Sequence, residues 1–465
     1  MIHKICTNKT VSQPFTTHHS LFTNYHLIGV AGVGMSALAQ VLLAQGARVS
    51  GSDRFHDTGQ KLTVLDKLRE ASLELVPQDG SGIKPGLSAV VVSSAIEDDN
   101  PDLTAAIRLK IPSIHRAEML ATLARGKRLI AVTGTAGKTT VTGMIGWILE
   151  QVGEDPTVVN GGPVLNWLNE QAIGNVRIGR SDTWVIEADE SDRSLLQFDP
   201  DWAVVTNISK DHFEVAETEA LFRAFAGKAT QGVVGRLGQK NDIEAMNSFK
   251  PKVTAQGFTF EYGGITFGAA LSGRHNAENA LQSVLLCERM GIDLRMISEA
   301  LSAFKGIQRR LERVGEAHDI TVIDDYAHNP AKITAAWQAV QPSHKRVIAV
   351  WRPHGYRPLA LMTDELVAVF GELARASDHV YLMPVYFAGG TADRSVTSEM
   401  FVERLHKNGV PSEFVPDYDE LVSRLLNRVK PGDVVLFMGA RDPDLPVVAR
   451  RFVAELKHLL MNGMA

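Results

Sequence analysis

One segment, residues 133–140 with the sequence Thr-Gly-Thr-Ala-Gly-Lys-Thr-Thr, constrains the fold more than any other part of this chain. The apolar residues 129–132 before it predict a strand, and a helix is predicted from Lys138 to about Val152. Glycines let the backbone turn tightly between strand and helix, so that its N–H groups face a phosphate, and the helix start adds partial positive charge. The segment therefore predicts an α/β domain that binds a nucleotide phosphate.

The spacing of this loop differs from the general phosphate-loop pattern. That pattern has Gly five residues before the final Gly, where this chain has Val132, so the loop is the shorter Gly-x-x-Gly-Lys-Thr-Thr. We expect Lys138 to contact the β and γ phosphates and the Thr139 hydroxyl to ligate Mg²⁺. The alternative is a turn that binds nothing, and the Lys-Thr-Thr run in a strand–helix context argues against it.

Two further predicted strands end in polar residues. Strand 183–188 leads through Glu187 into an acidic run, and strand 202–206 is followed closely by His212. Ligands of open α/β sheets bind at the carboxyl ends of strands, so we expect Lys138, Glu187 and His212 to meet in one crevice. There Thr139, Glu187 and His212 would hold Mg²⁺ together with waters and phosphate oxygens. Taken singly, the acidic run is a solvated loop and His212 a surface histidine; only their joint placement indicates a site.

The alternation of strands and helices continues along the chain, which implies parallel sheets with right-handed crossovers. The segment 226–271 is the exception: it is Gly-rich and predicted to be irregular, with a hairpin around Gly263-Gly264. We predict an α/β protein with a polar leader and three domains, at residues 1–23, 24–126, 127–313 and 314–465. The predicted strands outside the phosphate-loop region are 26–30, one that ends at 51–53, and 89–93, 320–324, 346–351, 379–383 and 433–438, with helices at 35–44 and 278–290.

The first domain has its own glycine-rich turn, with Gly29, Gly32 and Gly34 between a strand and a helix. The order Gly-x-x-Gly-x-Gly differs from the dinucleotide fingerprint Gly-x-Gly-x-x-Gly, yet Asp53 follows at about the distance of a ribose-binding acid. From these residues alone the hypothesis is an NAD-binding domain. An oxidoreductase therefore stays an alternative, which a fluorescence titration with NADH would test.

Composition further narrows the classes of protein to which this chain can belong. A chain of 465 residues is too long for one compact core, and 45% hydrophobic with 22% charged residues is typical of a globular protein. The net charge of −5 argues against nucleic-acid binding. Only Cys6 and Cys287 are present, which favours a reducing cytoplasm. No apolar run approaches the ~20 residues that cross a bilayer, and the polar start is no signal peptide. A monomer and a homodimer both stay open.

The loop Gly134-Thr135-Ala136-Gly137-Lys138-Thr139-Thr140 resembles the Gly-Thr-x-Gly-Lys-Thr loop of the Mur ligases, the amino-acid-adding enzymes of peptidoglycan synthesis. The resemblance extends in order from about residue 24 to about residue 440. It implies a Rossmann-like N-terminal domain, a P-loop ATPase-type central domain and a Rossmann-like C-terminal domain. The other motifs that carry it are Glu187, Thr206-Asn207, Asp211-His212, residues 273–280, Arg309-Arg310 and residues 324–330.

The resemblance implies a role for each matching residue. Residues 134–140 would hold the ATP phosphates, Thr139 and Glu187 one Mg²⁺, and His212 a second metal. In the remaining motifs, Asn276 and Asn279 would face the adenine, Arg310 would neutralise phosphate charge, Asp325 would hold the ribose, and His354 would lie near the amino acid or the sugar's lactyl carboxylate. The implied catalytic set is Lys138, Glu187, His212, Arg310 and His354.

Within the family, the first domain resembles most the branch that joins L-alanine to the lactyl carboxylate of UDP-N-acetylmuramate. The resemblance replaces NAD by the uridine diphosphate of that substrate, which uses the same glycine turn. A related branch attaches a recycled tripeptide to the same sugar nucleotide. The motifs are residues 29–35, 51–53, 92–96 and 116–120, and the implied substrate-binding residues are Gly32, Gly34, Met35, Asp53 and Ser93.

The implied chemistry is an ATP-dependent amide ligation. The substrate carboxylate attacks the γ-phosphate, cationic groups stabilise the transferring oxygens, and the amine attacks the resulting acyl phosphate. Water has to be excluded from that intermediate, and closure of the C-terminal domain, which carries the amino-acid side of the site, would exclude it.

Several positions depart from the family pattern. Ala136 stands where the alanine-adding branch has His, Gly355 replaces an arginine, and Arg441-Asp442 replaces Gly-Asn. The stretch 212–275 is short, and Lys228 lacks the context of the family's carbamylated lysine, so that role is not assigned to it. The departures leave two alternatives open: a divergent Mur-type ligase with another amine or sugar nucleotide, and a nucleotide-binding regulator of the same fold. The retained phosphate-loop residues argue against the regulator.

Overall fold

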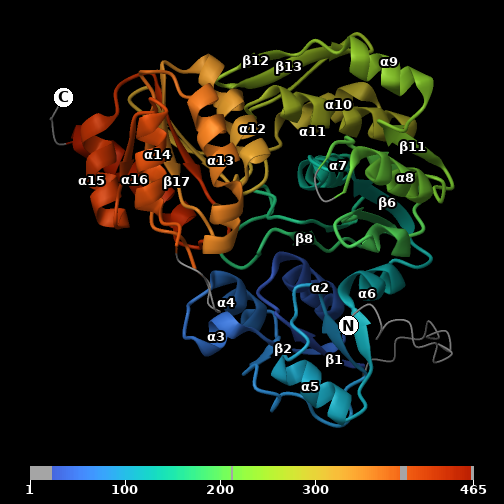
Figure 1. Cartoon of the computed structure of the whole chain (residues 1–465). Helices are drawn as coiled ribbons and strands as arrows, with labels where there is room; N and C mark the ends of the chain where they lie inside the picture. The colour runs from blue at the N-terminus through green and yellow to red at the C-terminus, as the bar shows by residue number, and fades with distance from the viewer. Residues whose placement is uncertain (1–22, 211–212, 388–394, 462–465) are drawn as a thin grey trace. The chain divides into compact units, whose positions relative to one another are not determined.

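The computed structural model describes residues 23–210, 213–387 and 395–461. Most of the predicted leader, and His212, lie outside these residues. The described residues form four sheets. The chain divides into two compact units, one of residues 1–249 and 278–304 and the other of residues 250–277 and 305–465 (Figure 1). The central segment of the chain thus contributes to both units, and the domain boundaries given above stay a prediction.

The first sheet has five parallel strands in the order β3-β2-β1-β4-β5. Leu27 and Val91 face a core that includes Leu38 of the first helix, whereas Ile28 and Val90 face the opposite core with Ala105. Because alternate residues of a strand point to opposite faces, helices cover both sides of this sheet (Figure 1). Its elements are β1 (Asn24–Ile28), α2 (Val33–Ala44), β2 (Arg48–Ser52), α3 (Arg54–Asp57), α4 (Thr63–Glu70), β3 (Glu74–Val76), β4 (Ala89–Val92), α5 (Pro101–Arg108), β5 (Ser113–His115) and α6 (Arg116–Leu123).

The second sheet has the order β11-β10-β6-β9-β7-β8 and is parallel except for the pair β7 and β8. Strand β6 lies between β10 and β9, so the three strand ends chosen from the sequence are neighbours. Its elements are β6 (Arg128–Thr133), α7 (Lys138–Gln151), β7 (Thr157–Val159), β8 (Val176–Arg177), β9 (Thr183–Glu187), η1 (Ser194–Gln197), β10 (Trp202–Val205), α8 (Val215–Ala226), β11 (Gly232–Gly235) and α9 (Lys240–Ser248), and α10 (Arg274–Arg289) and α11 (Leu294–Ser302) come later in the chain.

The prediction of an irregular segment at 226–271 is wrong. Besides β11 and α9, this segment forms an antiparallel sheet of β12 (Lys252–Thr254), β13 (Gly257–Tyr262) and β14 (Ile265–Ala269). The hairpin at Gly263-Gly264 is confirmed, and both glycines have positive φ, 56° and 76°, as a two-residue hairpin turn requires. The strands bury Phe260 against Phe267 at 5.4 Å between ring centroids. The glycines of this segment interrupt the alternation of apolar and polar residues that would have predicted these strands.

The third large sheet has the order β15-β16-β20-β17-β18-β19 and is parallel except for β15 and β16. Every residue of β20 is buried, which is typical of a strand covered by helices on both faces. Its elements are β15 (Glu312–Ala317), β16 (Ile320–Asp325), α12 (Pro330–Val340), η2 (Gln341–Ser343), β17 (Arg346–Trp351), α13 (Tyr356–Leu373), β18 (His379–Leu382), α14 (Ser398–Lys407), β19 (Ser412–Phe414), α15 (Tyr418–Arg428), β20 (Asp433–Met438) and α16 (Leu445–Met461). The predicted α/β class with three parallel-rich sheets is confirmed.

Cys287 is buried in α10 as a free thiol, and burial raises its pKa above the usual range. Within the described part of the chain, the helices are all too short or too polar to cross a membrane.

Candidate active site

The phosphate loop joins β6 to α7, and its glycines are required by its surroundings. Gly134 has φ +139° and Gly137, which precedes α7, has φ +84°, values that L side chains rarely adopt. A Cβ at Gly134 would lie 1.9 Å from the Thr206 hydroxyl oxygen, and one at Gly137 would lie 2.5 Å from Asn279 Oδ1. The predicted adenine-side residue Asn279 therefore packs directly on the loop.

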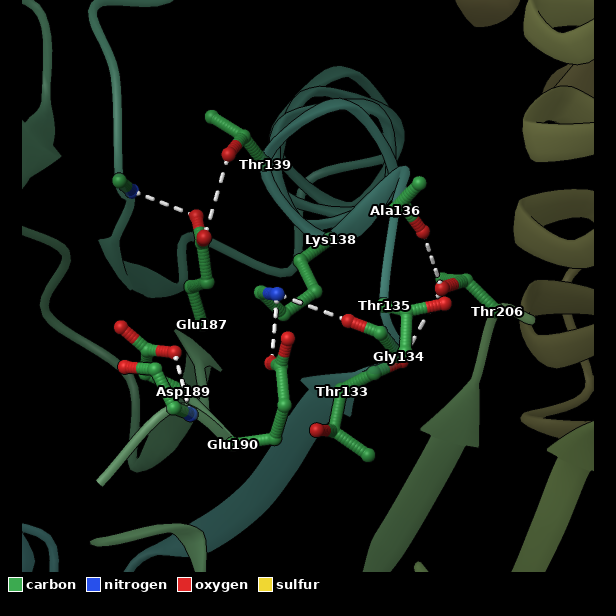
Figure 2. A network of polar contacts seen from close by, with 12 residues as sticks. Thr133, Gly134, Thr135, Ala136, Lys138, Thr139, Glu187, Asp189, Glu190 and Thr206 are labelled. Carbon is green, nitrogen blue, oxygen red and sulfur yellow. Dashed lines mark hydrogen bonds and ion pairs between the residues drawn. The ribbon is translucent and has the colours of Figure 1, made fainter. Parts of the chain in front are cut away.

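Residues after β10 brace the same loop (Figure 2). The Thr206 hydroxyl donates to the Ala136 carbonyl at 2.6 Å, and Asn207 Oδ1 accepts from the Ala136 amide at 2.7 Å and from the Thr135 hydroxyl at 3.1 Å. The Ala136 amide is thus used within the protein, which corrects the expectation that the loop amides in general face phosphate. The first N–H groups of α7 have no partner within the helix and stay suited to a phosphate.

The Lys138 side chain is held by two acceptors (Figure 2). Its ammonium donates to the Gly134 carbonyl at 2.7 Å and to Glu190 Oε2 at 2.6 Å. The Glu190 side chain is only 2% exposed. Burial raises the pKa of Glu190 despite the Lys138 charge, which favours its ionised form. Glu190 was not among the predicted site residues, although it belongs to the acidic run after β9 that helped to indicate a site in the sequence.

Glu187 lies at the end of β9 and connects two segments. Its Oε1 accepts from the Thr139 hydroxyl at 3.1 Å, and its Oε2 accepts from the Gly161 amide at 2.8 Å. The predicted metal ligands Thr139 and Glu187 are therefore in contact, and hydroxyl and carboxylate oxygens suit Mg²⁺. The described residues contain no cluster of three or more His, Cys, Asp or Glu side chains that could hold a metal alone.

We predict that Gly161→Ala lowers turnover about 10-fold, because the new Cβ would lie 2.3 Å from Glu187 Oε2 and displace that carboxylate. The variant should also need more Mg²⁺ for half-maximal rate, which a titration of the initial rate with Mg²⁺ measures. Gly371→Ala in α13 is the control: its Cβ would meet nothing within 4 Å, so the rate should not change. An unchanged Mg²⁺ dependence in Gly161→Ala would contradict the assignment of Glu187.

A cavity of about 430 Å³ borders the glycine-rich start of α2 and reaches the acidic residues after β9. All five residues predicted to bind a sugar nucleotide line it: Gly32, Gly34, Met35, Asp53 and Ser93. Glu187 and Asp189 also line it, together with residues that the prediction did not include, among them Gln78, Asn100 and Arg116. The volume is in the range of small-molecule sites.

Hydrogen bonds join α2, whose start borders this cavity, to Asn175 just before β8. Gln40 of α2 donates to Asn175 Oδ1 at 2.9 Å, and Asn175 Nδ2 donates to the Val33 carbonyl at 2.9 Å. Burial opposes ionisation of Asp189, yet a hydrogen bond from Ser191 and the charge of Lys138 keep its pKa below the usual value. Asp189 therefore presents a carboxylate to the cavity, where the charge of Lys138 acts on it.

Asp53 fixes the glycine turn of the first domain. Asp53 is buried, with 4% of the residue exposed. Its Oδ2 accepts from the Ala31 amide at 2.9 Å, and its Oδ1 caps α3 by accepting from the Phe55 amide at 3.0 Å. Both oxygens keep a further lone pair for a ligand.

We predict that Asp53→Asn raises KM for the sugar nucleotide about 10-fold, since the amide NH₂ would face a backbone N–H and one hydrogen bond is worth ~1 kcal/mol or more. Initial rates at varied sugar nucleotide measure this change, and KM for ATP should not move. A shift in KM for ATP of the same size would contradict a role confined to the first domain.

The second compact unit contains Arg310 and Asp325. The two adjacent arginines of this unit, Arg309 and Arg310, have different surroundings. Arg309 donates to Asp324 at 3.2 Å and to the Gly439 carbonyl, whereas Arg310 is exposed, with its guanidinium 5.8 Å from the Tyr326 ring centroid. Arg310 is therefore the arginine that a phosphate could reach. Asp325 accepts from two backbone amides at 2.7 and 2.8 Å, and burial raises its pKa.

His354 and Asn276 belong to the same unit. His354 is partly buried, its ring lies 5.0 Å from that of His328, and burial followed by the charge of Arg441 lowers its pKa. Asn276 is buried and donates to the Ser272 carbonyl at 2.8 Å. Their roles in binding stay predictions.

The structure also bears on the departures from the family pattern. Arg352 donates to Asp442 at 2.6 Å and to the Tyr418 hydroxyl at 2.7 Å, so it is committed within the protein, while Arg357 is exposed. Lys228 pairs with Asp199 at 2.8 Å and donates to the Leu196 carbonyl.

Fold and site together define a nucleotide-binding α/β enzyme with a phosphate loop. Three family models match in succession: "Mur ligase family, catalytic domain" at 24–128, "Mur ligase middle domain" at 132–227, and "Mur ligase, glutamate ligase domain" at 309–441. The UDP-N-acetylmuramate–L-alanine ligase of Gloeobacter violaceus is 37% identical over 89% of this chain and 92% of its own length. The ligase of the same name from Synechococcus sp. is 34% identical, over 96% and 97%.

A solved structure shares the fold as well. The UDP-N-acetylmuramate–alanine ligase of Thermotoga maritima has a TM-score of 0.74 and 25% identity, covering 94% of this chain and 99% of that one. A murein peptide ligase of Psychrobacter arcticus has a TM-score of 0.63 at 21% identity, over 93% of this chain and 98% of that one. The chain belongs to the Mur ligase family, and it is a ligase.

Proposed function

We propose that this protein joins L-alanine to the lactyl carboxylate of UDP-N-acetylmuramate in an ATP-dependent reaction that passes through an acyl phosphate, as a step of peptidoglycan precursor synthesis. One observation carries the proposal: a single cavity borders both the glycine-rich start of α2 and Glu187, which contacts the phosphate-loop residue Thr139. A sugar nucleotide held at α2 can therefore present its carboxylate near the loop. The names of the relatives at 34–37% identity support the same reaction.

The residues present fit ATP and Mg²⁺. The start of α7 and Lys138 would hold the phosphates, with Asn279 beside the loop, and Thr139 and Glu187 would ligate Mg²⁺. When bound, ATP supplies the phosphoryl group and Mg²⁺ neutralises the charge on its oxygens.

The chain's own residues position the phosphate groups and stabilise their charge during the reaction. Lys138, fixed by Gly134 and Glu190, offers its remaining N–H to a phosphate, since an ammonium has three donors. Thr206 and Asn207 keep the loop in one conformation before the nucleotide arrives, which avoids reorganisation during the reaction. We assign the roles of Arg310, Asp325 and His354 by the resemblance alone.

The test is phosphate release with ATP, Mg²⁺ and UDP-N-acetylmuramate while the amine is varied. We expect release with L-alanine, and mass spectrometry should find the product heavier than the sugar nucleotide by one alanyl residue. Release only with a tripeptide or another amine would contradict the proposed amine. No release with any amine, despite ATP binding, would favour the regulator.

A further inference from the structure

Glu190 is a buried acid whose only described cationic partner is Lys138. Glu190 is 1% exposed although it lies in a loop, and its Oε2 accepts from the Lys138 ammonium at 2.6 Å. The other oxygen, Oε1, is buried and has no hydrogen-bond partner among the residues that the structure describes. A buried carboxylate without full solvation is costly unless a cation compensates it, so the position of this acid has a reason beyond packing.

The contacts of Lys138 suggest that reason. A lysine carries a flexible four-carbon stem and three N–H donors, and without fixed acceptors its ammonium samples many positions. Here one N–H donates to the Gly134 carbonyl at 2.7 Å, at the first glycine of the loop, and a second donates to Glu190. These two acceptors fix the ammonium, and they leave one N–H.

We propose that Glu190 is a positioning residue for phosphoryl transfer: its buried carboxylate holds the Lys138 ammonium against the Gly134 carbonyl, so that the third N–H is ready for the nucleotide phosphate. This inference rests on the proposed function. Glu190 acts through Lys138, and the charged carboxylate is needed because a neutral amide accepts a weaker hydrogen bond from the ammonium.

The sign of the expected effects separates this role from simple electrostatics. Removal of a negative charge near bound phosphates would tighten ATP binding or leave it unchanged. Loss of a positioned donor lowers the rate of the chemical step, because a displacement of about 1 Å costs up to about 100-fold. Glu190→Gln should therefore lower kcat about 10- to 100-fold without raising KM for ATP.

The experiment compares the full-length chain with Glu190→Gln and Glu190→Asp. The first removes the charge at constant shape, and the second keeps the charge but withdraws it by one methylene group, so it serves if the first folds poorly. Glu219→Gln, which removes the carboxylate of an exposed ion pair with Arg223, is the matched control and should behave like wild type. Phosphate release gives kcat, and calorimetry with a non-hydrolysable ATP analogue gives the affinity.

A readout without nucleotide tests the contact itself. Brief acetylation followed by peptide mass spectrometry measures how fast Lys138 reacts; we expect it to react several-fold faster in Glu190→Gln than in wild type. The rate effect must also depend on Lys138, so Glu190→Gln should lower the residual rate of Lys138→Ala no further.

Three results would overturn the proposal: wild-type kcat in both variants, a rise in KM for ATP with kcat unchanged, or an equal loss from Glu190→Gln in the Lys138→Ala background. Wild type alone tests the proposed function. If wild type released no phosphate with alanine, that function would fail, and Lys138 acetylation together with slow hydrolysis of ATP by the same proteins would still decide the role of Glu190.

Discussion

Lys138→Ala is expected to lower ATP-dependent phosphate release by about 10²–10³-fold, the loss that follows removal of one charge-stabilising donor from an active site. The structure adds a second consequence, because the Lys138 side chain is 14% exposed and its partner Glu190 only 2%. Removing one member of a buried ion pair leaves the other uncompensated, which costs up to ~3–5 kcal/mol of stability. The variant should fold but unfold at lower denaturant concentration.

The pH dependence of that stability loss has a definite sign. Burial raises the pKa of Glu190 above its unfolded value, so the folded state gains stability where this acid is protonated and loses it as the pH rises through the folded pKa. Removal of the Lys138 charge strengthens that trend. The deficit of Lys138→Ala relative to wild type should therefore grow from acidic to neutral pH in urea unfolding curves.

Matched variants distinguish the two effects. Lys138→Ala combined with Glu190→Gln should recover stability but not phosphate release, because the amide needs no cation. Lys228→Ala is the control, since Lys228 likewise pairs with a carboxylate and donates to a carbonyl, yet it has no assigned role. Near-normal release in Lys138→Ala, or a large loss in Lys228→Ala, would contradict the site described here.

Glu187→Gln is expected to lower kcat by about 10²–10³-fold as well. The carboxylate accepts from Thr139 and Gly161 with its two oxygens, whereas the amide has only one acceptor oxygen; if that oxygen stays on the Gly161 N–H, the amide NH₂ faces Thr139, whose hydroxyl then has to accept instead of donate. The lost charge also weakens Mg²⁺ binding, and raising the Mg²⁺ concentration should restore part of the rate. Initial rates over a Mg²⁺ titration measure both effects.

Glu217→Gln on α8 is the control for Glu187, because its carboxylate pairs with Arg193 at the surface and no function is assigned to it. It should keep the wild-type rate and Mg²⁺ dependence. If Glu187→Gln lost activity to an extent that Mg²⁺ did not influence, Glu187 would have a role other than metal binding.

The class of the fold and the position of the phosphate loop could both be predicted from the amino-acid sequence. Strand β6, Gly134, Gly137 and Lys138 form one continuous segment, and a strand–turn–helix of this composition has few alternative conformations. Sheet order could be inferred in part, since β9 and β10 both end in polar residues and do flank β6. The NAD hypothesis for the first domain shows the limit, because a glycine turn at a helix start does not distinguish one diphosphate from another.

The tertiary structure alone decided which polar groups meet. Glu190 and Glu187 stand three residues apart in one acidic run, yet one contacts Lys138 and the other Thr139 and Gly161. No local pattern specifies such pairings, because they depend on how segments distant in sequence pack. The same holds for the cavity that connects α2 to the end of β9. Local sequence fixed the loop that can bind a phosphate, and long-range packing selected the carboxylates that serve it.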